Sequence, residues 1–280
     1  MVENNQAKVD VYYVSDPLCS HCWGLEPELQ KFLSQYGHYI NFHTVMGGLI
    51  YNWDSFAGDA RNHIYEAKDT TAHWREFAKT SGMPIDGSLM QDNPVTSSYP
   101  ASQVVKLLQE KNHDIANQFL RKVREALFVH NQNISKRDVL IDIVNKLGEN
   151  GDDIVQRALT LEYEEKVHED KQLMRSLGAK VTPAVIFVND KNRKFPRVGM
   201  NTAENFAKTL KRALRMEVLE KYDPDPLHKW LEKQDVIFAK EVEVMYELTP
   251  EEVKPFIERT LSEYTYELHE FQDTFYIKGV

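Results

Sequence analysis

Residues 15–27 read Ser-Asp-Pro-Leu-Cys-Ser-His-Cys-Trp-Gly-Leu-Glu-Pro and hold both cysteines of the 280-residue chain, Cys19 and Cys22. The run before them, residues 9–14 (Val-Asp-Val-Tyr-Tyr-Val), is β-branched and aromatic, which predicts a buried strand. After them, apolar residues recur at helical spacing: Leu25, Leu29, Phe32 and Leu33. The sequence therefore predicts a strand, a Cys-x-x-Cys pair and a helix in immediate succession.

This order of elements suits thiol chemistry. A helix N-terminus presents unpaired backbone N–H groups and the positive end of the helix dipole, and both favour an anion. Cys19 is therefore expected to have a pKa of roughly 3.5–7 instead of about 8.5, which makes it a thiolate at neutral pH. Cys22 lies one turn further on, close enough to form a disulfide or to release a mixed one. His21 can add a positive charge that stabilises the thiolate further.

A strand, a Cys-x-x-Cys pair and a helix are typical of a thioredoxin-like redox site. The alternative, half of a zinc site, would need ligands from elsewhere, and neither a second cysteine pair nor a recognisable histidine spacing supplies them. No metal site is expected. Pro183 provides a second signature, because a Thr-Pro step before a strand resembles the cis-proline loop that faces the cysteines in this fold. Such a fold can also keep its cysteines and serve as a binding scaffold.

The pattern along the chain predicts an α/β fold with an insertion. Residues 39–46 alternate like a second strand, whereas helical spacing dominates from about 54 to 177. Residues 184–188 return to strand, residues 195–199 form a short partner strand, and residues 203–219 form a helix. We therefore expect a helical domain inserted between the two halves of a sheet.

A stiff linker, residues 221–226, ends in Asp-Pro-Asp-Pro and separates a first domain, residues 1–220, from a C-terminal module, residues 227–280. About sixty residues are marginal for independent stability, so the module should pack against the first domain.

Within this module the pattern predicts a small α+β domain. Residues 227–234 should form a helix, and residues 236–248 alternate like a strand. Thr249-Pro250-Glu251-Glu252 is a capping box that opens the next helix. Residues 264–268 alternate and residues 274–277 close the module as a final strand. The layout resembles a winged helix, but its acidic and aromatic composition favours a protein-contact surface over DNA binding.

Composition narrows the range of functions. The formal net charge is −9, which argues against binding to nucleic acid or to an anionic membrane. No run approaches the roughly 20 apolar residues of a membrane span. The polar N-terminus lacks the apolar core of a signal peptide, so a cytoplasmic location, where thiols are kept reduced, is expected.

With both signatures in place, the first ~220 residues resemble the DsbA-like, FrnE-type branch of the thioredoxin superfamily. Asp16-Pro17-Leu18-Cys19, residues 22–27 and the C-terminal module are similar, over essentially the whole chain, to the ClpXP adapter family of Gram-positive bacteria called SpxH or YjbH. The resemblance implies an adapter, without a cofactor, that binds the transcription factor Spx and promotes its degradation by ClpXP. Some members carry a histidine-rich, zinc-binding N-terminus, but residues 1–8 here contain no histidine.

Two functions therefore compete. In an adapter the cysteines are optional, and the partner is expected to contact the linker, the adjoining C-terminal strands and the neighbouring face of the thioredoxin domain. The aromatic residues expected to contribute, unless they only form the core of the module, are Tyr264, Tyr266, Phe271 and Tyr276. The alternative is a cytosolic thiol–disulfide oxidoreductase, in which Cys19 attacks, Cys22 resolves, His21 tunes the thiolate and Pro183 positions the substrate. A glutathione-dependent isomerase fits less well, because a Cys-x-x-Cys pair suits dithiol exchange.

Overall fold

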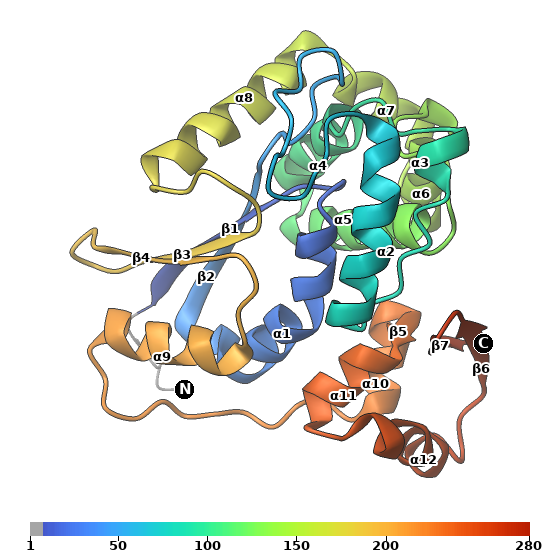
Figure 1. Ribbon diagram of the computed structural model, residues 1–280. Coiled ribbons are helices and arrows are strands. Elements are labelled where there is room, and N and C mark those ends of the chain that lie inside the picture. The colour runs from blue at the N-terminus through green and yellow to red at the C-terminus, as the bar shows by residue number, and fades with distance from the viewer. Residues whose placement is uncertain (1–7) are drawn as a thin grey trace.

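The computed structural model describes residues 8–280 and is built around a four-stranded sheet (Figure 1). Strand β1 (Val9–Ser15) lies parallel to β2 (Ile40–Met46) and antiparallel to β3 (Ala184–Val188), and β4 (Lys194–Val198) pairs with β3 at the far edge. The four strands predicted for this sheet are confirmed. The expectations for the extreme N-terminus concern residues that lie almost wholly outside the described range.

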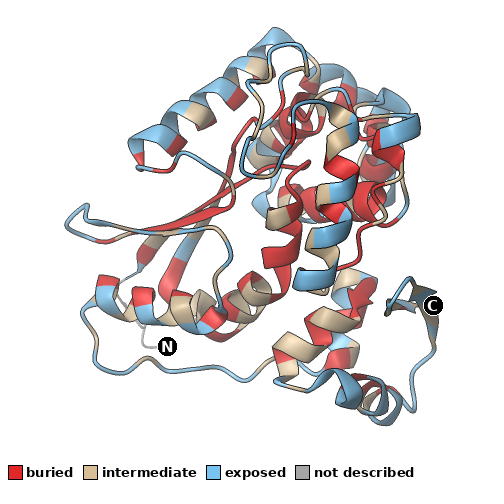
Figure 2. Cartoon of the chain, viewed as in Figure 1, coloured by how far each residue is buried: buried red, intermediate tan, exposed pale blue. Residues whose placement is uncertain are grey.

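Helices cover both faces of this sheet (Figure 1), and β1 and β3 at its centre are largely buried (Figure 2). On one face α1 (Ser20–Tyr36) and α9 (Ala203–Leu214) pack on alternate residues of β1, including Val11 and Tyr13. On the other face Val14 packs with the C-terminal part of α8 (Leu161–Ser176). This alternation follows from the strand period of two, which sends successive side chains to opposite faces.

A block of helices between β2 and β3 confirms the predicted insertion. Besides α8 and the 3₁₀ turn η2 (Ala67–Asp69), the elements here are α2 (Thr70–Ser81), α3 (Leu89–Asp92), α4 (Tyr99–Lys111), α5 (His113–Phe128), α6 (Arg137–Lys146) and α7 (Gly151–Ala158). Another 3₁₀ turn, η1 (Gly37–Tyr39), directly precedes β2. The predicted start was too early, because residues 54–66 form no helix. Trp53, at the entry of this segment, instead donates its indole N–H to the Val95 carbonyl at 2.8 Å and is anchored without a helix.

The C-terminal module follows a segment, residues 215–226, that has no regular structure. Its elements are α10 (Leu227–Gln234), β5 (Val236–Phe238), α11 (Ala239–Tyr246), α12 (Pro250–Thr260), β6 (Tyr266–Phe271) and β7 (Thr274–Gly279). The three strands form a sheet in the order β5-β7-β6. The α+β architecture is as expected, the Thr249 capping box is present, and the likeness to a winged helix stays a prediction.

The strand predicted over residues 236–248 is wrong beyond Phe238, where α11 begins. Val242 and Met245 are buried three residues apart on one side of this helix, so a helical face fits the pattern as well as the alternation did. The contacts of the Glu241 side chain favour the helix over the strand. Its carboxylate accepts the Phe238 N–H at 2.9 Å, which caps the helix, and also binds Arg121 of α5.

The module packs against the rest of the molecule, as expected. Its own core is centred on Leu227, Val242 and Ile257, but Val236 and Phe238 belong to the large core of the insertion. Phe238 makes an edge-to-face contact with Trp23, with ring centroids 5.2 Å apart. The C-terminal module therefore touches the residue that follows Cys22 in the sequence.

Candidate functional site

The cysteine pair lies at the start of α1, where the sequence places it. Cys19 is the N-cap residue, and its Sγ accepts a hydrogen bond from the backbone N–H of Cys22 at 3.2 Å. Both cysteines are free and buried, with exposed fractions of 5% and 0%. Gly47, which follows β2, passes so close to the loop before β3 that a Cβ on it would lie 2.5 Å from Thr182.

A small pocket of about 140 Å³ opens beside Cys19. Its walls are largely apolar and come from the start of α1, the segment between β2 and α2, and α2 itself; they include Leu49, Ile50, Trp53, Phe56, Ile64 and Trp74. Thr182 also lines it, and the Thr182–Pro183 peptide bond is cis, so the structure places Pro183 in the predicted loop. Cys22 does not line this pocket, so Cys19 is the cysteine that an external group can reach.

His21 does not supply the expected positive charge. Its ring stacks on His73 and lies against Phe77, with centroid distances of 5.3 and 4.2 Å. Burial, and then the neighbouring His73, lower the pKa of His21, so the ring is neutral at pH 7. The sequence correctly placed His21 beside the cysteines, but its role as a cationic partner of the thiolate is not supported.

The positive charge near the pair comes from Arg124 of α5, which is 1% exposed. Its Nη1 donates to Glu26 Oε2 at 3.0 Å, and its Nη2 donates to the Ser15 hydroxyl and to the Asp16 carbonyl at 3.4 Å. Tyr13 completes the surroundings by donating its hydroxyl to the Cys22 carbonyl at 3.3 Å.

This environment acts on the pKa of both thiols. Burial raises the pKa of Cys19, and its hydrogen bond with Cys22 and the charge of Cys22 raise it further. Burial also opposes ionisation of Cys22, but the hydrogen bond with Cys19, the charge of Arg124 and a hydrogen bond with Ser15 outweigh it and lower the Cys22 pKa. The two thiols therefore titrate as one coupled pair, and Arg124 is the positive charge that favours its ionised form.

Sequence reasoning missed Arg124, although a signal was present. The residues around Arg124 form the apolar face of α5 and include Phe119, Val123 and Leu127. An arginine on such a face is rarely buried without a charged partner. Arg121 and Arg124 therefore indicated buried charges on this helix. Glu125, four residues after Arg121, is a local partner of that arginine, but nothing local identified Glu241 or the partners of Arg124.

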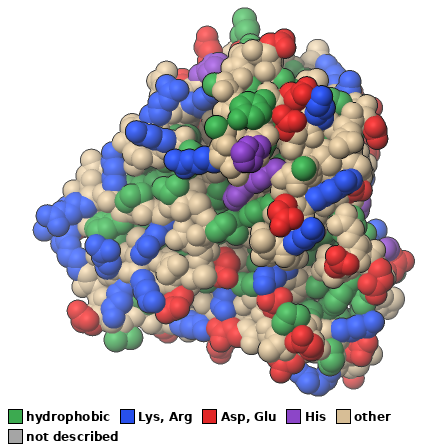
Figure 3. All heavy atoms as spheres, viewed as in Figure 1, with side chains coloured by type: hydrophobic (Ala, Val, Ile, Leu, Met, Phe, Trp, Pro, Cys, Tyr) green, Lys and Arg blue, Asp and Glu red, His purple; other side chains and the backbone are tan. Residues whose placement is uncertain are grey.

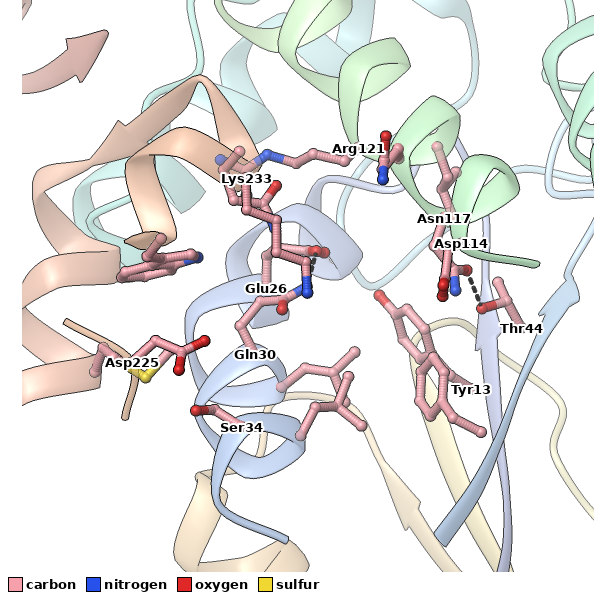
Figure 4. A pocket seen from close by; sticks show the side chains of 18 of the residues that line it. Tyr13, Glu26, Gln30, Ser34, Thr44, Asp114, Asn117, Arg121, Asp225 and Lys233 are labelled. Atoms are coloured by element: carbon pink, nitrogen blue, oxygen red, sulfur yellow. Dashed lines mark hydrogen bonds between the residues drawn. The ribbon is translucent and has the colours of Figure 1, made fainter. Parts of the chain in front are cut away.

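A second and larger space, a cleft of about 540 Å³, lies beside the middle of α1 (Figure 4). Its walls come from α1, β1, β2 and α5 on one side, and from the linker, α10 and α11 on the other. Tyr13, Glu26 and Arg124 belong to both this wall and the network behind Cys22. The cleft thus lies where the linker meets the face of the thioredoxin domain. The C-terminal strands were expected to contribute to the partner-binding surface, but α10 and α11 line this cleft instead.

The four aromatic residues proposed for partner binding do not form one surface. Tyr264 is 43% exposed and stacks on His228, and Tyr266 packs on the core of the module. Phe271 and Tyr276 pack against the core of the insertion. None of the four lines the cleft or the pocket, and their contact role stays a prediction.

Charge is unevenly spread over the face shown in Figure 3, where Lys and Arg gather over the region of α8, β4 and α9. Within residues 8–280 no set of three His, Cys, Asp or Glu side chains is placed to hold a metal ion. None of the helices described is long and apolar enough to cross a bilayer.

Comparison with known proteins agrees with this architecture. The thioredoxin family model matches residues 12–209, which span the sheet, the cysteine pair and the helical insertion. The chain therefore belongs to the thioredoxin family.

More specific similarity comes from curated relatives named ClpXP adapter protein SpxH. The one from Halalkalibacterium halodurans is 26% identical over 95% of this chain and 87% of its own length. The one from Bacillus subtilis is also 26% identical, over 88% of this chain and 81% of its own length.

Solved structures support the fold. A putative protein disulfide isomerase from Nitrosomonas europaea matches 74% of this chain and 96% of its own, with a TM-score of 0.60 and 18% identity. The cytosolic disulfide reductase DsbM from Pseudomonas aeruginosa matches 74% of this chain and 98% of its own, with a TM-score of 0.58 and 20% identity. These matches establish the DsbA-like thioredoxin architecture.

Proposed function

We propose that this protein is a ClpXP adapter that binds the transcription factor Spx and promotes its degradation. The observation that carries the proposal is the extent of the similarity. The thioredoxin family match ends at residue 209, whereas the adapter from Halalkalibacterium halodurans aligns with 95% of the chain. The shared region therefore includes at least most of the C-terminal module, for which a simple thiol–disulfide enzyme has no need.

We place the partner in the cleft between the thioredoxin domain and the C-terminal module. A specific interface buries roughly 1,200–2,000 Å² in total, and a cleft with walls from both parts lets one partner segment contact both. The two arginines of its wall are already paired, Arg121 with Glu241 and Arg124 with Glu26. Partner binding at this cleft therefore does not depend on those two charges.

The remaining charges at the cleft indicate what kind of segment it accepts. Asp114, Asp223, Asp225 and Lys233 line it, and within residues 8–280 none of the four side chains is part of an ion pair. Three carboxylates against one ammonium group favour a segment that carries positive charge. Leu29, Leu33 and Trp230 provide apolar contact area beside them.

Thiol–disulfide exchange is the second candidate function. It is favoured by the cis Thr182–Pro183 bond beside a free cysteine pair with a small pocket at Cys19. As an adapter the protein acts in the cytoplasm and not as an enzyme, and thiol exchange remains a side activity of the scaffold. Proteins of this fold serve both purposes, so the site must be tested directly.

The deciding experiment is reconstituted degradation of Spx by ClpXP with and without this protein, alongside its Cys19→Ala/Cys22→Ala variant. Acceleration by both proteins is the expected result, because binding does not need the thiols. Acceleration by the intact pair alone would make thiol chemistry part of the mechanism. No acceleration by either would reject the adapter function. A ClpXP substrate that needs no adapter serves as the control for protease activity.

A further inference from the structure

We propose that the positively charged face over the end of α8, the hairpin of β3 and β4, and α9 is a docking site for a short acidic segment of a partner protein. We call this face the basic surface and define it by the Lys and Arg residues of positions 171–215. None of these cations lines the cleft or the pocket at Cys19. The inference therefore goes beyond the adapter function and does not depend on it.

The charge of this segment is opposite to that of the chain. Residues 171–215 contain eleven Lys and Arg but two Asp and Glu, a formal charge of +9, whereas the whole chain carries −9. Lys and Arg gather on one face over α8, β4 and α9 (Figure 3). Burial, and then the neighbouring Arg175, lower the pKa of Lys171, so like charges are close together here. Such crowding destabilises the protein by itself, and a bound anion would relieve it.

Most of these cations lack a carboxylate partner. Three of the eleven, on α9 or directly after it, form ion pairs with Glu204, Glu217 and Asp190. Exposed pairs of this kind are common on a solvated helix and contribute little to stability. The other eight form no ion pair within residues 8–280, although both faces of β4 contribute to the surface. The positive charge is therefore largely available to a partner.

Two of the unpaired cations are held in place by neutral groups. Arg197 of β4 donates its Nε–H to the Thr209 hydroxyl of α9 at 2.6 Å. The guanidinium of Arg212 lies over the Phe195 ring, 5.9 Å from its centroid. These contacts restrict the two side chains without neutralising them. A carboxylate that binds them therefore costs less conformational entropy than one that must order free arginines.

The edge of the sheet indicates how the partner is recognised. β4 is an edge strand, but Pro196 in its middle has no backbone N–H, which protects the edge against the addition of another strand. Val198 and Met200, 50% and 44% exposed, offer apolar contact area at the end of β4. The occupant is therefore read mainly through its side chains, by carboxylates on the cations and an apolar residue on Val198 and Met200.

A short acidic segment fits this surface better than an extended polyanion. Outside residues 171–215 the chain carries a formal charge of −18. Duplex DNA or an anionic bilayer would reach beyond the basic surface and meet this negative charge, whereas a short segment stays within it. The cleft, with three carboxylates against one ammonium group, has the opposite preference. The two surfaces therefore select segments of opposite charge.

The test measures the binding of a fluorescent peptide rich in Glu and Leu to the full-length protein by anisotropy. The peptide should bind, and added salt should weaken the binding, because the Debye length is only about 8 Å at physiological ionic strength and shortens further with salt. A peptide with Lys in place of each Glu should not displace it. Lys191→Glu/Arg193→Glu reverses two exposed cations of the hairpin and should raise the dissociation constant at least about tenfold.

The matched control is Lys136→Glu/Arg137→Glu, which changes the net charge by the same amount at two exposed positions at the start of α6. It should leave the peptide affinity nearly unchanged. The proposal is overturned if the acidic peptide does not bind or if both double variants weaken it equally.

Other occupants of the basic surface are tested with the same hairpin variant. Duplex DNA or vesicles of anionic lipid that bind more tightly than the peptide, and lose that binding in Lys191→Glu/Arg193→Glu, would overturn the proposal in favour of an extended polyanion. A dimer that sedimentation detects for the original protein and not for this variant would overturn it in favour of a second copy of the chain.

Discussion

The pocket at Cys19 and the cleft beside Tyr13 both open onto α1, yet they share no lining residue and differ in size and polarity. The pocket is about 140 Å³, largely apolar, and built within the thioredoxin domain and its insertion. The cleft is about 540 Å³, carries several charges, and exists only because the C-terminal module provides one wall. One space suits a small reactive group, and the other suits a segment of a partner protein.

This difference shows how one scaffold separates two activities. The pocket depends on the cysteine motif, on residues 49–74, which follow β2 in the sequence, and on Thr182. The cleft depends on docking between parts far apart in the sequence, through Phe238 against Trp23 and Glu241 against Arg121. A change that undocks the module should therefore destroy the cleft and spare the pocket.

The largest effect is expected from Glu241→Ala. It removes both hydrogen bonds between the buried Arg121 guanidinium and Glu241 and leaves Glu125 as the remaining carboxylate partner, which should lower the free energy of unfolding by roughly 3 kcal/mol, measured by urea denaturation. Spx binding should be lost together with the cleft, whereas the reaction of Cys19 with a small disulfide should persist. The matched control is Lys221→Ala, which breaks an exposed ion pair with Glu247 and should cost no more than about 1 kcal/mol. Equal losses in both variants would contradict this account of docking.

A smaller effect is expected when the cleft is filled. Ser34 of α1 lines the cleft (Figure 4), and Ser34→Trp should place an indole where the partner segment binds. The dissociation constant for Spx should rise at least about tenfold, equivalent to about 1.4 kcal/mol, in a direct binding assay. Unchanged affinity with a folded protein would place the partner elsewhere, and Tyr264→Ala would then be the next variant to measure.

The pocket can be filled in the same way. Asn62 lines it, and Asn62→Trp should slow modification of Cys19 by oxidised glutathione severalfold, because the approach to the sulfur is narrowed. Spx binding should be unaffected. Ser34→Trp is the reciprocal control and should leave the thiol reaction at its original rate. If either variant changed both readouts, the two spaces would not act independently.

The smallest effect concerns the exposed rim between the module and α1. Glu247 binds Lys31 at 3.0 Å and Lys221 at 3.3 Å, and both interactions, that with Lys31 first, lower its pKa. A carboxylate whose pKa is lower in the folded state stabilises the protein above its unfolded pKa of about 4.3, and this stabilisation is lost as pH falls through the folded value. Because the site is exposed, Glu247→Gln should cost less than about 1 kcal/mol at pH 7.

Urea unfolding at pH 7 and pH 3 checks the sign of this effect. The difference in unfolding free energy between the original protein and Glu247→Gln should be present at pH 7 and smaller at pH 3. A difference that grew toward low pH would mean that the pKa of Glu247 is raised by folding.

Much of the fold was accessible from sequence because its signals are local. The β-branched run at residues 9–14, the helical spacing after Cys22 and the Thr-Pro step at Pro183 each report the environment of adjacent residues. The strand wrongly predicted beyond Phe238 shows where such signals fail. The alternating Glu and Val residues there are consistent with a strand. The segment forms a helix instead, in which Glu241 accepts the Phe238 N–H at the helix start and binds the distant Arg121.

Local sequence patterns are enough to predict the thioredoxin framework and the place of Cys19 and Cys22 at a helix start, since side-chain period and backbone preference act over a few residues. The charges that surround the pair and the shape of the cleft come from tertiary packing. Arg124 reaches Ser15 across 109 positions of sequence, and Arg121 reaches Glu241 across 120. Electrostatic partners and cleft walls depend on which helices meet in space, and no local pattern encodes that meeting.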